Sequence, residues 1–269
     1  MISFELKYFR KGKPVSETIS LPSSWNELSK KQLLYVAEYW EAWQLLAQNN
    51  MTLIKAKSLL FLKLMDGNKI WDYARRLYYI KQLSNESLYD LASLTNFIFD
   101  ANALTKNPFP EVKIHFRTFY GPPDKLSGIR ADEFSFADSM YLHYNTTKDT
   151  LFLDQLIAVL YRQGSEKNGD DKRDAFDKNR IEQTANYVSR LKHTEKHAIL
   201  LFYIGCRTLI VSRYPEIFTK ETEAAASKST WIDVIVAMSG GKFGNFSETS
   251  TTDLSLIFKE IVNLKNPKK

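Results

Sequence analysis

Long stretches of the chain carry apolar residues at helical spacing, and few residues interrupt them. Between residues 28 and 48, one such set recurs every three or four positions, namely Leu33, Val36, Ala37, Trp40, Trp43 and Ala47. This spacing places the side chains on one face of an α-helix. The 269 residues include only 10 Gly and 8 Pro, the residues that most often end regular elements. The sequence therefore predicts a mainly α fold, a multi-helix globular bundle.

Two segments depart from this helical pattern and indicate strands. Residues 2–9, ISFELKYF, alternate apolar and polar side chains, which is the period of a β-strand. Gly12 and Pro14 then mark a turn, and SETISL brings the chain back, so a small N-terminal β-hairpin is predicted over residues 2–21. In the middle of the chain, a short central strand region is predicted from the alternation of Val112, Ile114, Phe116 and Thr118.

Composition suggests three segments along the chain. The first, residues 1–22, holds the hairpin, which we expect to pack on the helical body because an isolated two-stranded hairpin is marginally stable in water. The second, residues 23–220, is the main helical domain. The third, residues 221–269, is a C-terminal helical segment. The polar, small-residue linker KETEAAASKST marks the boundary before it.

The composition also limits where such a protein works. Hydrophobic residues make up 44% of the chain and charged residues 25%, which are ordinary globular values. No window of 18 uncharged apolar residues is present, so we expect no membrane-spanning helix, and the N-terminus lacks the features of a secretory signal. The single cysteine, Cys206, excludes a disulfide within the chain and is expected to be a small buried hydrophobe. These features favour a cytoplasmic location.

The sequence holds no pattern typical of catalysis, and no cofactor is expected. His193 and His197 in HTEKH share one helix face, as zinc ligands would, but no third ligand lies at an expected spacing. Two surface histidines are therefore the favoured interpretation. SGGKFGNF lacks the glycine spacing of a phosphate-binding loop and predicts a helix C-terminus followed by a tight loop. We expect a protein that is not an enzyme.

A basic stretch keeps nucleic-acid binding open as an alternative function. Residues 55–81 hold seven basic and two acidic side chains, interleaved with aromatic residues that would stack on bases. Helical Lys and Arg also commonly cover an outer face while the aromatic rings pack inward, and this is the interpretation we favour. Salt-dependent DNA binding that falls when three basic residues are replaced by Ala would support the alternative: Lys69, Arg75 and Arg76.

The chain changes abruptly from apolar to charged between Leu156 and Arg180. Residues 165–182 contain six acidic and five basic positions. Because these charges nearly cancel, we do not expect the segment to bind phosphate groups. Its glycines indicate a flexible connector between two core helices. Asp170 and Asp171, just ahead of two basic residues, suggest the start of a helix with acidic caps.

Three phrases, in this order, resemble a family of phage proteins. They are LPSSWNELSKKQLLYVAEYW, LIAVLYRQG with DKRDAF, and TWIDVIVAMSGGKFGNFSETSTTDL. They resemble proteins encoded beside the tail tape-measure gene in tailed phages and prophages of Bacteroidetes-type bacteria, which are similar to tail assembly chaperones or neighbouring tail-morphogenesis proteins. The shared patterns are Trp-x-Glu-Leu entering a helix, Leu-Tyr-Arg before a charged loop, and Phe-Gly after a Trp-led helix.

The resemblance implies a non-enzymatic protein of the bacterial host cytoplasm, or of the virion, that binds other tail or virion proteins such as the tape-measure protein. It supplies no catalytic residues. One alternative is a virion structural component, such as a connector or adaptor ring subunit, which would form a closed cyclic assembly. The further alternative is the nucleic-acid-binding regulatory protein described above. The residues leave the oligomeric state open.

Four residues are candidates for contact with a partner protein: Trp25, Arg173, Phe176 and Trp231. Each is a residue type common at interface hot spots and lies near a segment boundary or in a loop. The competing interpretation places each of them in the core or in solvent. Replacing Phe176 with Ser distinguishes the two, since an exposed anchor can be removed without loss of thermal stability and a core residue cannot.

Overall fold

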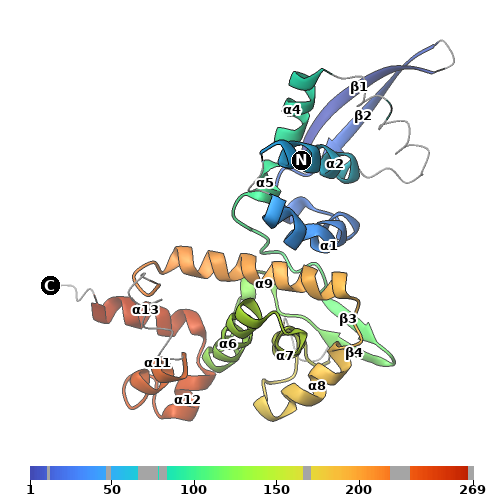
Figure 1. The fold of residues 1–269 in the computed structure, drawn as a ribbon. Helices are drawn as coiled ribbons and strands as arrows, with labels where there is room; N and C mark the ends of the chain where they lie inside the picture. The colour runs from blue at the N-terminus through green and yellow to red at the C-terminus, as the bar shows by residue number, and fades with distance from the viewer. Residues whose placement is uncertain are drawn as a thin grey trace. The chain divides into compact units, whose positions relative to one another are not determined.

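The computed structural model of the protein describes residues 1–10, 13–46, 50–65, 78, 84–165, 171–218 and 231–265 (Figure 1). Helices predominate, and the strands form two small antiparallel hairpins, so the predicted fold class is confirmed. Parts of the sequence-based prediction lie outside the described residues. They are the basic stretch from residue 66 to residue 81, apart from Tyr78, with its Lys69, Arg75 and Arg76, and the linker at 220–230.

The chain divides into two compact units, Met1–Leu104 and Thr105–Lys269. Composition does not single out this position. The segment boundaries suggested at residues 22 and 220 stay predictions, as does the packing of the N-terminal hairpin on helices.

The first unit combines the N-terminal hairpin with helices. Strand β1 pairs with β2 in an antiparallel register that runs from Ile2↔Leu21 to Arg10↔Lys13. Helix α1 packs on α2, and α2 packs on α4. The elements are β1 (Ile2–Arg10), β2 (Lys13–Leu21), the 3₁₀ turn η1 (Trp25–Glu27), α1 (Lys30–Leu46), α2 (Asn50–Leu64), α4 (Asn85–Ser93) and α5 (Asn96–Phe99).

Helix α1 begins with a cap at Ser29. Ser29 Oγ accepts a hydrogen bond from the backbone N–H of Gln32 at 3.3 Å, and the N–H of Ser29 donates to Gln32 Oε1 at 2.8 Å. This reciprocal cap satisfies two donors at the start of the helix. Gln32 Nε2 also donates to the carbonyl oxygen of Leu64 at 2.6 Å, which ties the start of α1 to the end of α2. On the predicted apolar face, three residues are buried: Leu33, Val36 and Ala37.

The second unit is built around two helices that pack against each other, with further helices as their neighbours. Its elements are β3 (Glu111–Ile114), β4 (Arg117–Tyr120), the 3₁₀ turn η2 (Asp124–Leu126), α6 (Ala131–Thr147), α7 (Thr150–Leu160), the 3₁₀ turn η4 (Lys178–Arg180), α8 (Ile181–Val188), α9 (His193–Arg213), α11 (Trp231–Met238), α12 (Phe246–Thr251) and α13 (Leu254–Lys265).

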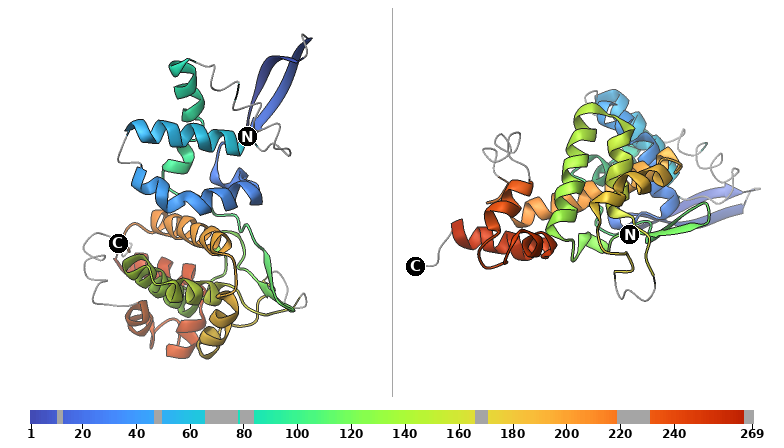
Figure 2. Two further views of the ribbon diagram at one scale, coloured as in Figure 1. Left: turned by 45° about the vertical axis from the view of Figure 1, so that its right-hand side comes forward. Right: turned by 90° about the horizontal axis from the view of Figure 1, so that it is seen from below.

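Helices α6 and α7 pack against each other and form the centre of this unit. The connection between them is Lys148, in the left-handed region with φ 58°, and Asp149, whose carboxylate accepts from the N–H of Leu151 at 2.9 Å. Helix α8 packs on α7, α11 to α13 pack on α6, and α9 lies along the α6–α7 pair (Figure 2). Helix α9 contributes a run of buried residues to this unit: Ala198, Ile199, Leu201, Phe202 and Tyr203.

The central strand region is a tight hairpin, and one sequence-based expectation is corrected there. Strand β3 pairs with β4 from Glu111↔Tyr120 to Ile114↔Arg117, so the chain reverses at His115 and Phe116. The alternation predicted that Phe116 shares a face with the strand residues before it. Instead His115 adopts a left-handed conformation, with φ 54°, and Phe116 is fully exposed at the turn.

Candidate functional site

The charged segment after α7 folds back on itself within its described residues. Gly164 pairs with Arg173 as an antiparallel bridge, and the N–H of Ser165 donates to the carbonyl oxygen of Lys172 at 2.9 Å. A Cβ at Gly164 would lie 1.9 Å from that carbonyl oxygen, so only glycine fits here. The expectation of an open, flexible connector is therefore corrected for residues 162–165 and 171–174, which are paired.

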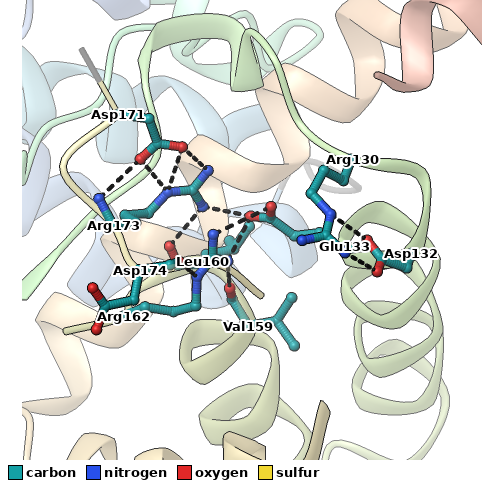
Figure 3. Close-up of polar contacts among 9 residues, drawn as sticks. All are labelled: Arg130, Asp132, Glu133, Val159, Leu160, Arg162, Asp171, Arg173 and Asp174. Carbon is teal, nitrogen blue, oxygen red and sulfur yellow. Dashed lines mark hydrogen bonds and ion pairs between the residues drawn. The ribbon is translucent and has the colours of Figure 1, made fainter. Parts of the chain in front are cut away.

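The side chain of Arg173 points into the interior and contacts two carboxylates (Figure 3). Its Nη1 donates to Glu133 Oε1 and, at 3.0 Å, to the carbonyl oxygen of Leu160. Its Nε and Nη2 donate to Asp171 at 2.8 and 2.7 Å. The side chains of Arg173 and Glu133 are 1% and 2% exposed. Arg173 is thus an interior residue of this fold.

A second arginine shares the same glutamate. Arg162 Nη1 lies 2.9 Å from Glu133 Oε1 and donates to the carbonyl oxygen of Val159 at 2.7 Å. Its Nε donates to the carbonyl oxygen of Asp174 at 2.9 Å. We call Glu133, Arg162, Arg173 and Asp171 the Glu133 network (Figure 3). It joins α6, the end of α7 and the charged segment.

Burial and pairing compete within the Glu133 network. Burial alone would raise the pKa of Asp171, but the hydrogen bonds and charge of Arg173 outweigh it and lower this pKa. Burial lowers the pKa of Arg162, and the charge of Glu133 opposes it only in part. For Arg173 burial again works against the charged form, but Glu133 and Asp171 raise its pKa overall. The network therefore holds charged side chains that depend on one another.

The pKa shift of Asp171 predicts a sensitivity to acid. Because its folded-state pKa lies below the unfolded value of about 3.9, its contribution to stability is complete above that pH and is lost as the pH falls through the folded pKa. We expect Asp171→Asn to flatten the fall in stability below about pH 4. Urea unfolding followed by circular dichroism at several pH values measures this. An unchanged pH slope in the variant would contradict the prediction.

The acidic helix cap expected near Asp171 lies elsewhere. Asp170 is outside the described residues, and no helix starts at Asp171, whose carboxylate binds Arg173. The cap is Asp177, which accepts from the N–H of Asn179 at 3.0 Å at the start of η4.

Phe176 lies between Arg173 and that cap and lines a small pocket. Its ring is half-buried, with its centroid 5.6 Å from that of Phe136 and 5.8 Å from the guanidinium carbon of Arg162. The pocket, of about 60 Å³, lies between β4, the end of α7, the charged segment and α8. We call it the α8 pocket; its lining includes Arg117, Phe119, Ala158, Phe176, Arg180 and Tyr187.

Asp138 on α6 is the centre of a second buried polar cluster. Its Oδ1 accepts from Tyr203 Oη at 3.0 Å and from Arg207 Nε at 2.6 Å, both on α9. Its Oδ2 accepts from Trp231 Nε1 at 2.9 Å. Burial, together with the nearby Asp138 charge, raises the pKa of Tyr203 well above its usual value, so this phenol acts as a donor. The cluster fastens α9 and α11 to α6.

Trp231, at the start of α11, also packs in an aromatic cluster. Its ring centroid lies 5.6 Å from Phe134, 5.4 Å from Phe218 and 5.4 Å from Phe258. After α11, the segment SGGKFGNF forms the tight loop that the sequence predicts, with Gly240 and Gly244 at φ 81° and 78°. Trp231 therefore joins α11 to both α6 and α13.

Trp25 lies in the first unit and is 2% exposed. Its ring meets that of Trp40 edge to face at a centroid distance of 5.3 Å. Of the four candidate contact residues, the structure brings together Arg173 and Phe176, which lie in one segment. Trp25 and Arg173 have interior positions, and Phe176 and Trp231 are half-buried. A role for any of them in binding a partner stays a prediction, and the two interior positions do not favour it.

The histidine pair is only partly a surface feature. The ring centroids of His193 and His197 lie 3.9 Å apart, with the rings tilted at 46° to each other. However, His197 is buried and its Nε2 lies 3.3 Å from Tyr144 Oη, so the interpretation of both as surface histidines is corrected. Within the described ranges, no group of three His, Cys, Asp or Glu side chains could hold a metal ion.

Cys206 is buried in α9, as expected, and its Sγ lies 4.0 Å from the carbonyl oxygen of Thr105. Burial raises the pKa of its thiol to about 12. We expect the native protein to react with a maleimide at least ~100-fold more slowly than the urea-unfolded chain. In the native state the thiol is rarely ionised, and the reagent cannot reach it because it is buried. Mass spectrometry of timed samples measures this. Equal rates in the two states would show that the thiol is accessible.

In the part of the chain that the structure covers, no helix is both long and apolar enough to cross a membrane. Comparisons with known protein families, with curated proteins and with solved structures gave no match to this chain.

Proposed function

We propose that this chain is a non-enzymatic tail-morphogenesis protein of a tailed phage or prophage, similar to a tail assembly chaperone, that binds other tail proteins. The observation that carries the proposal is the ordered set of three sequence patterns, Trp-x-Glu-Leu, Leu-Tyr-Arg and Trp-led helix with Phe-Gly. The bacterial host cytoplasm, or the virion, is the proposed location.

Each of these patterns coincides with a position on which the fold depends, which supports the proposal. Trp25 of the first pattern is in the core of its unit. In the second, Tyr161 donates to Asn107 Oδ1 at 2.9 Å and Arg162 belongs to the Glu133 network. In the third, Trp231 binds Asp138. Sequences that share a fold retain such positions more readily than surface positions, because their loss costs stability.

Exposed apolar side chains offer anchors for a protein partner. Phe116 is fully exposed at the tip of the β3–β4 hairpin. Ile232 and Val236 are exposed one turn apart on α11 and so lie on the same side of that helix. Apolar anchors at this spacing suit packing against a helical partner, such as the proposed tape-measure protein.

The proposal implies that a tape-measure protein is encoded beside this chain. It is tested by co-expressing the full chain with that protein and isolating the complex. We expect co-purification, and light scattering of the chain alone should give a monomer or small dimer. A closed multimer of defined size would favour a connector or adaptor ring subunit instead. Absence of a complex, with salt-dependent DNA binding in its place, would favour the regulatory alternative.

A further inference from the structure

The α8 pocket combines an apolar floor with a basic rim. Phe119 and Ala158 are buried at its floor, and the half-buried rings of Phe176 and Tyr187 line its walls. Arg117 and Arg180 are exposed at its rim. A surface that pairs apolar walls with charged donors is typical of a binding site, since the walls supply burial and the donors fix orientation.

Arg117 is held in position while its donors stay available. Its guanidinium carbon lies 4.7 Å from the centroid of the Tyr187 ring, a stacking distance. The Tyr187 ring also packs against Phe119, with the two ring centroids 5.8 Å apart. Among the described residues, no acceptor engages the guanidinium N–H groups of Arg117. The arginine is therefore oriented in advance for a ligand oxygen.

Arg180 has donor capacity as well, whereas Arg162 does not. The Nε of Arg180 lies 3.5 Å from Asp177 Oδ2 in an exposed ion pair, and such pairs contribute little and rearrange easily. Arg162, which also lines the pocket, is saturated by Glu133 and by two carbonyl oxygens. The two rim arginines are thus the groups that would receive an anion.

Charge and size limit what that anion can be. Arg162 is balanced within the Glu133 network and Arg180 pairs with Asp177, so the charge that a ligand would meet at the rim is chiefly that of Arg117. Asp174 and Asp177 would repel a multiply charged phosphate or polyanion more strongly than a single carboxylate. The volume of about 60 Å³ has room for roughly four water-sized groups, enough for a small side chain and too little for a nucleobase.

We propose that the α8 pocket binds an acidic peptide segment of a partner protein, in which one carboxylate pairs with Arg117 and Arg180 and a neighbouring apolar side chain covers Phe119 and Phe176. This proposal goes beyond the tail-assembly assignment and does not depend on it, because it concerns the chemistry of the segment and not the identity of its parent protein.

The test uses the ¹⁵N-labelled full chain and a hexapeptide that holds a single Glu beside a Leu in an otherwise uncharged sequence. The matched Gln-Leu peptide, in which Gln replaces that Glu, is the uncharged control. Titration followed by NMR should give saturating shifts at the amides of Arg117, Phe176 and Arg180, with a dissociation constant on the order of 0.1–1 mM. The Gln-Leu peptide should bind at least fivefold more weakly. Equal binding of both peptides, or no saturating shift at these amides, would overturn the proposal.

Single substitutions test whether the two rim arginines bind the peptide. Arg117→Gln and Arg180→Gln should each weaken peptide binding at least fivefold, and Arg213→Gln, an equal charge change at the exposed end of α9, should leave it unchanged. Since Arg117 and Arg180 are exposed, melting temperatures should match the unmodified chain. Inorganic phosphate or a single-stranded oligonucleotide that binds this pocket more tightly than the peptide would overturn the choice of a carboxylate.

Discussion

Glu133→Gln is expected to lower the free energy of unfolding by about 3–5 kcal/mol, because it leaves the buried Arg173 and the partly buried Arg162 without their shared carboxylate. Arg173 and Arg162 both contact Glu133, and burial prevents water from replacing it. Removing one partner of a buried ion pair costs more than the pair itself contributes. Urea unfolding at neutral pH, followed by circular dichroism, measures the change.

The neighbouring carboxylate provides a matched control. Asp132 pairs with Arg130 in a partly exposed position, and burial raises its pKa despite that arginine. Its charged form is therefore disfavoured in the folded state, so Asp132→Asn should cost at most about 1 kcal/mol. Similar losses for the two variants would show that the Glu133 network has no special weight in stability.

Trp231→Ala is expected to lower the free energy of unfolding by about 3 kcal/mol. The change removes three aromatic contacts and leaves Asp138 Oδ2 without the indole donor. Trp231→Phe should recover most of the packing and lose the hydrogen bond, at about 1–2 kcal/mol. Thermal and urea unfolding of the full chain measure both.

Ile232 is the control for this position, since it follows Trp231 on the same helix and is 42% exposed. Ile232→Ala should change stability by less than about 0.5 kcal/mol. If Trp231→Ala were equally mild but prevented co-purification with the tape-measure protein, the hypothesis that Trp231 contacts a partner would be favoured over its role in packing.

Periodicity was enough to predict that helices predominate and where the two strand regions lie, because apolar spacing reflects burial directly. It did not predict the short helix α12. Periodicity did not predict the turn at His115 and Phe116, because these two residues continue the alternating strand pattern. Neither position holds the Gly or Asn that usually marks such a turn. The cap at Ser29 was predictable because its partners are three residues away.

The polar clusters were not predictable in the same way, because their members are far apart in sequence. Glu133 and Arg173 are 40 residues apart, and Asp138 and Trp231 are 93 apart. A partial signal exists in ADEFSFADSM, where Glu133 and Asp138 lie beside the buried Phe134 and Ala137. A carboxylate at the edge of an apolar helix face indicates a buried partner, but the sequence does not say which arginine supplies it.

The charged segment is anchored to the interior at one residue and lines the α8 pocket with another. Arg173 fixes it to Glu133, and three residues later Phe176 borders the α8 pocket. Any molecule that occupies the pocket must then favour the tethered arrangement, and by reciprocity the tether must raise the affinity for that molecule. Acidification that protonates Asp171 would weaken the hold of Arg173 on the charged segment, and with it the wall that Phe176 contributes to the pocket.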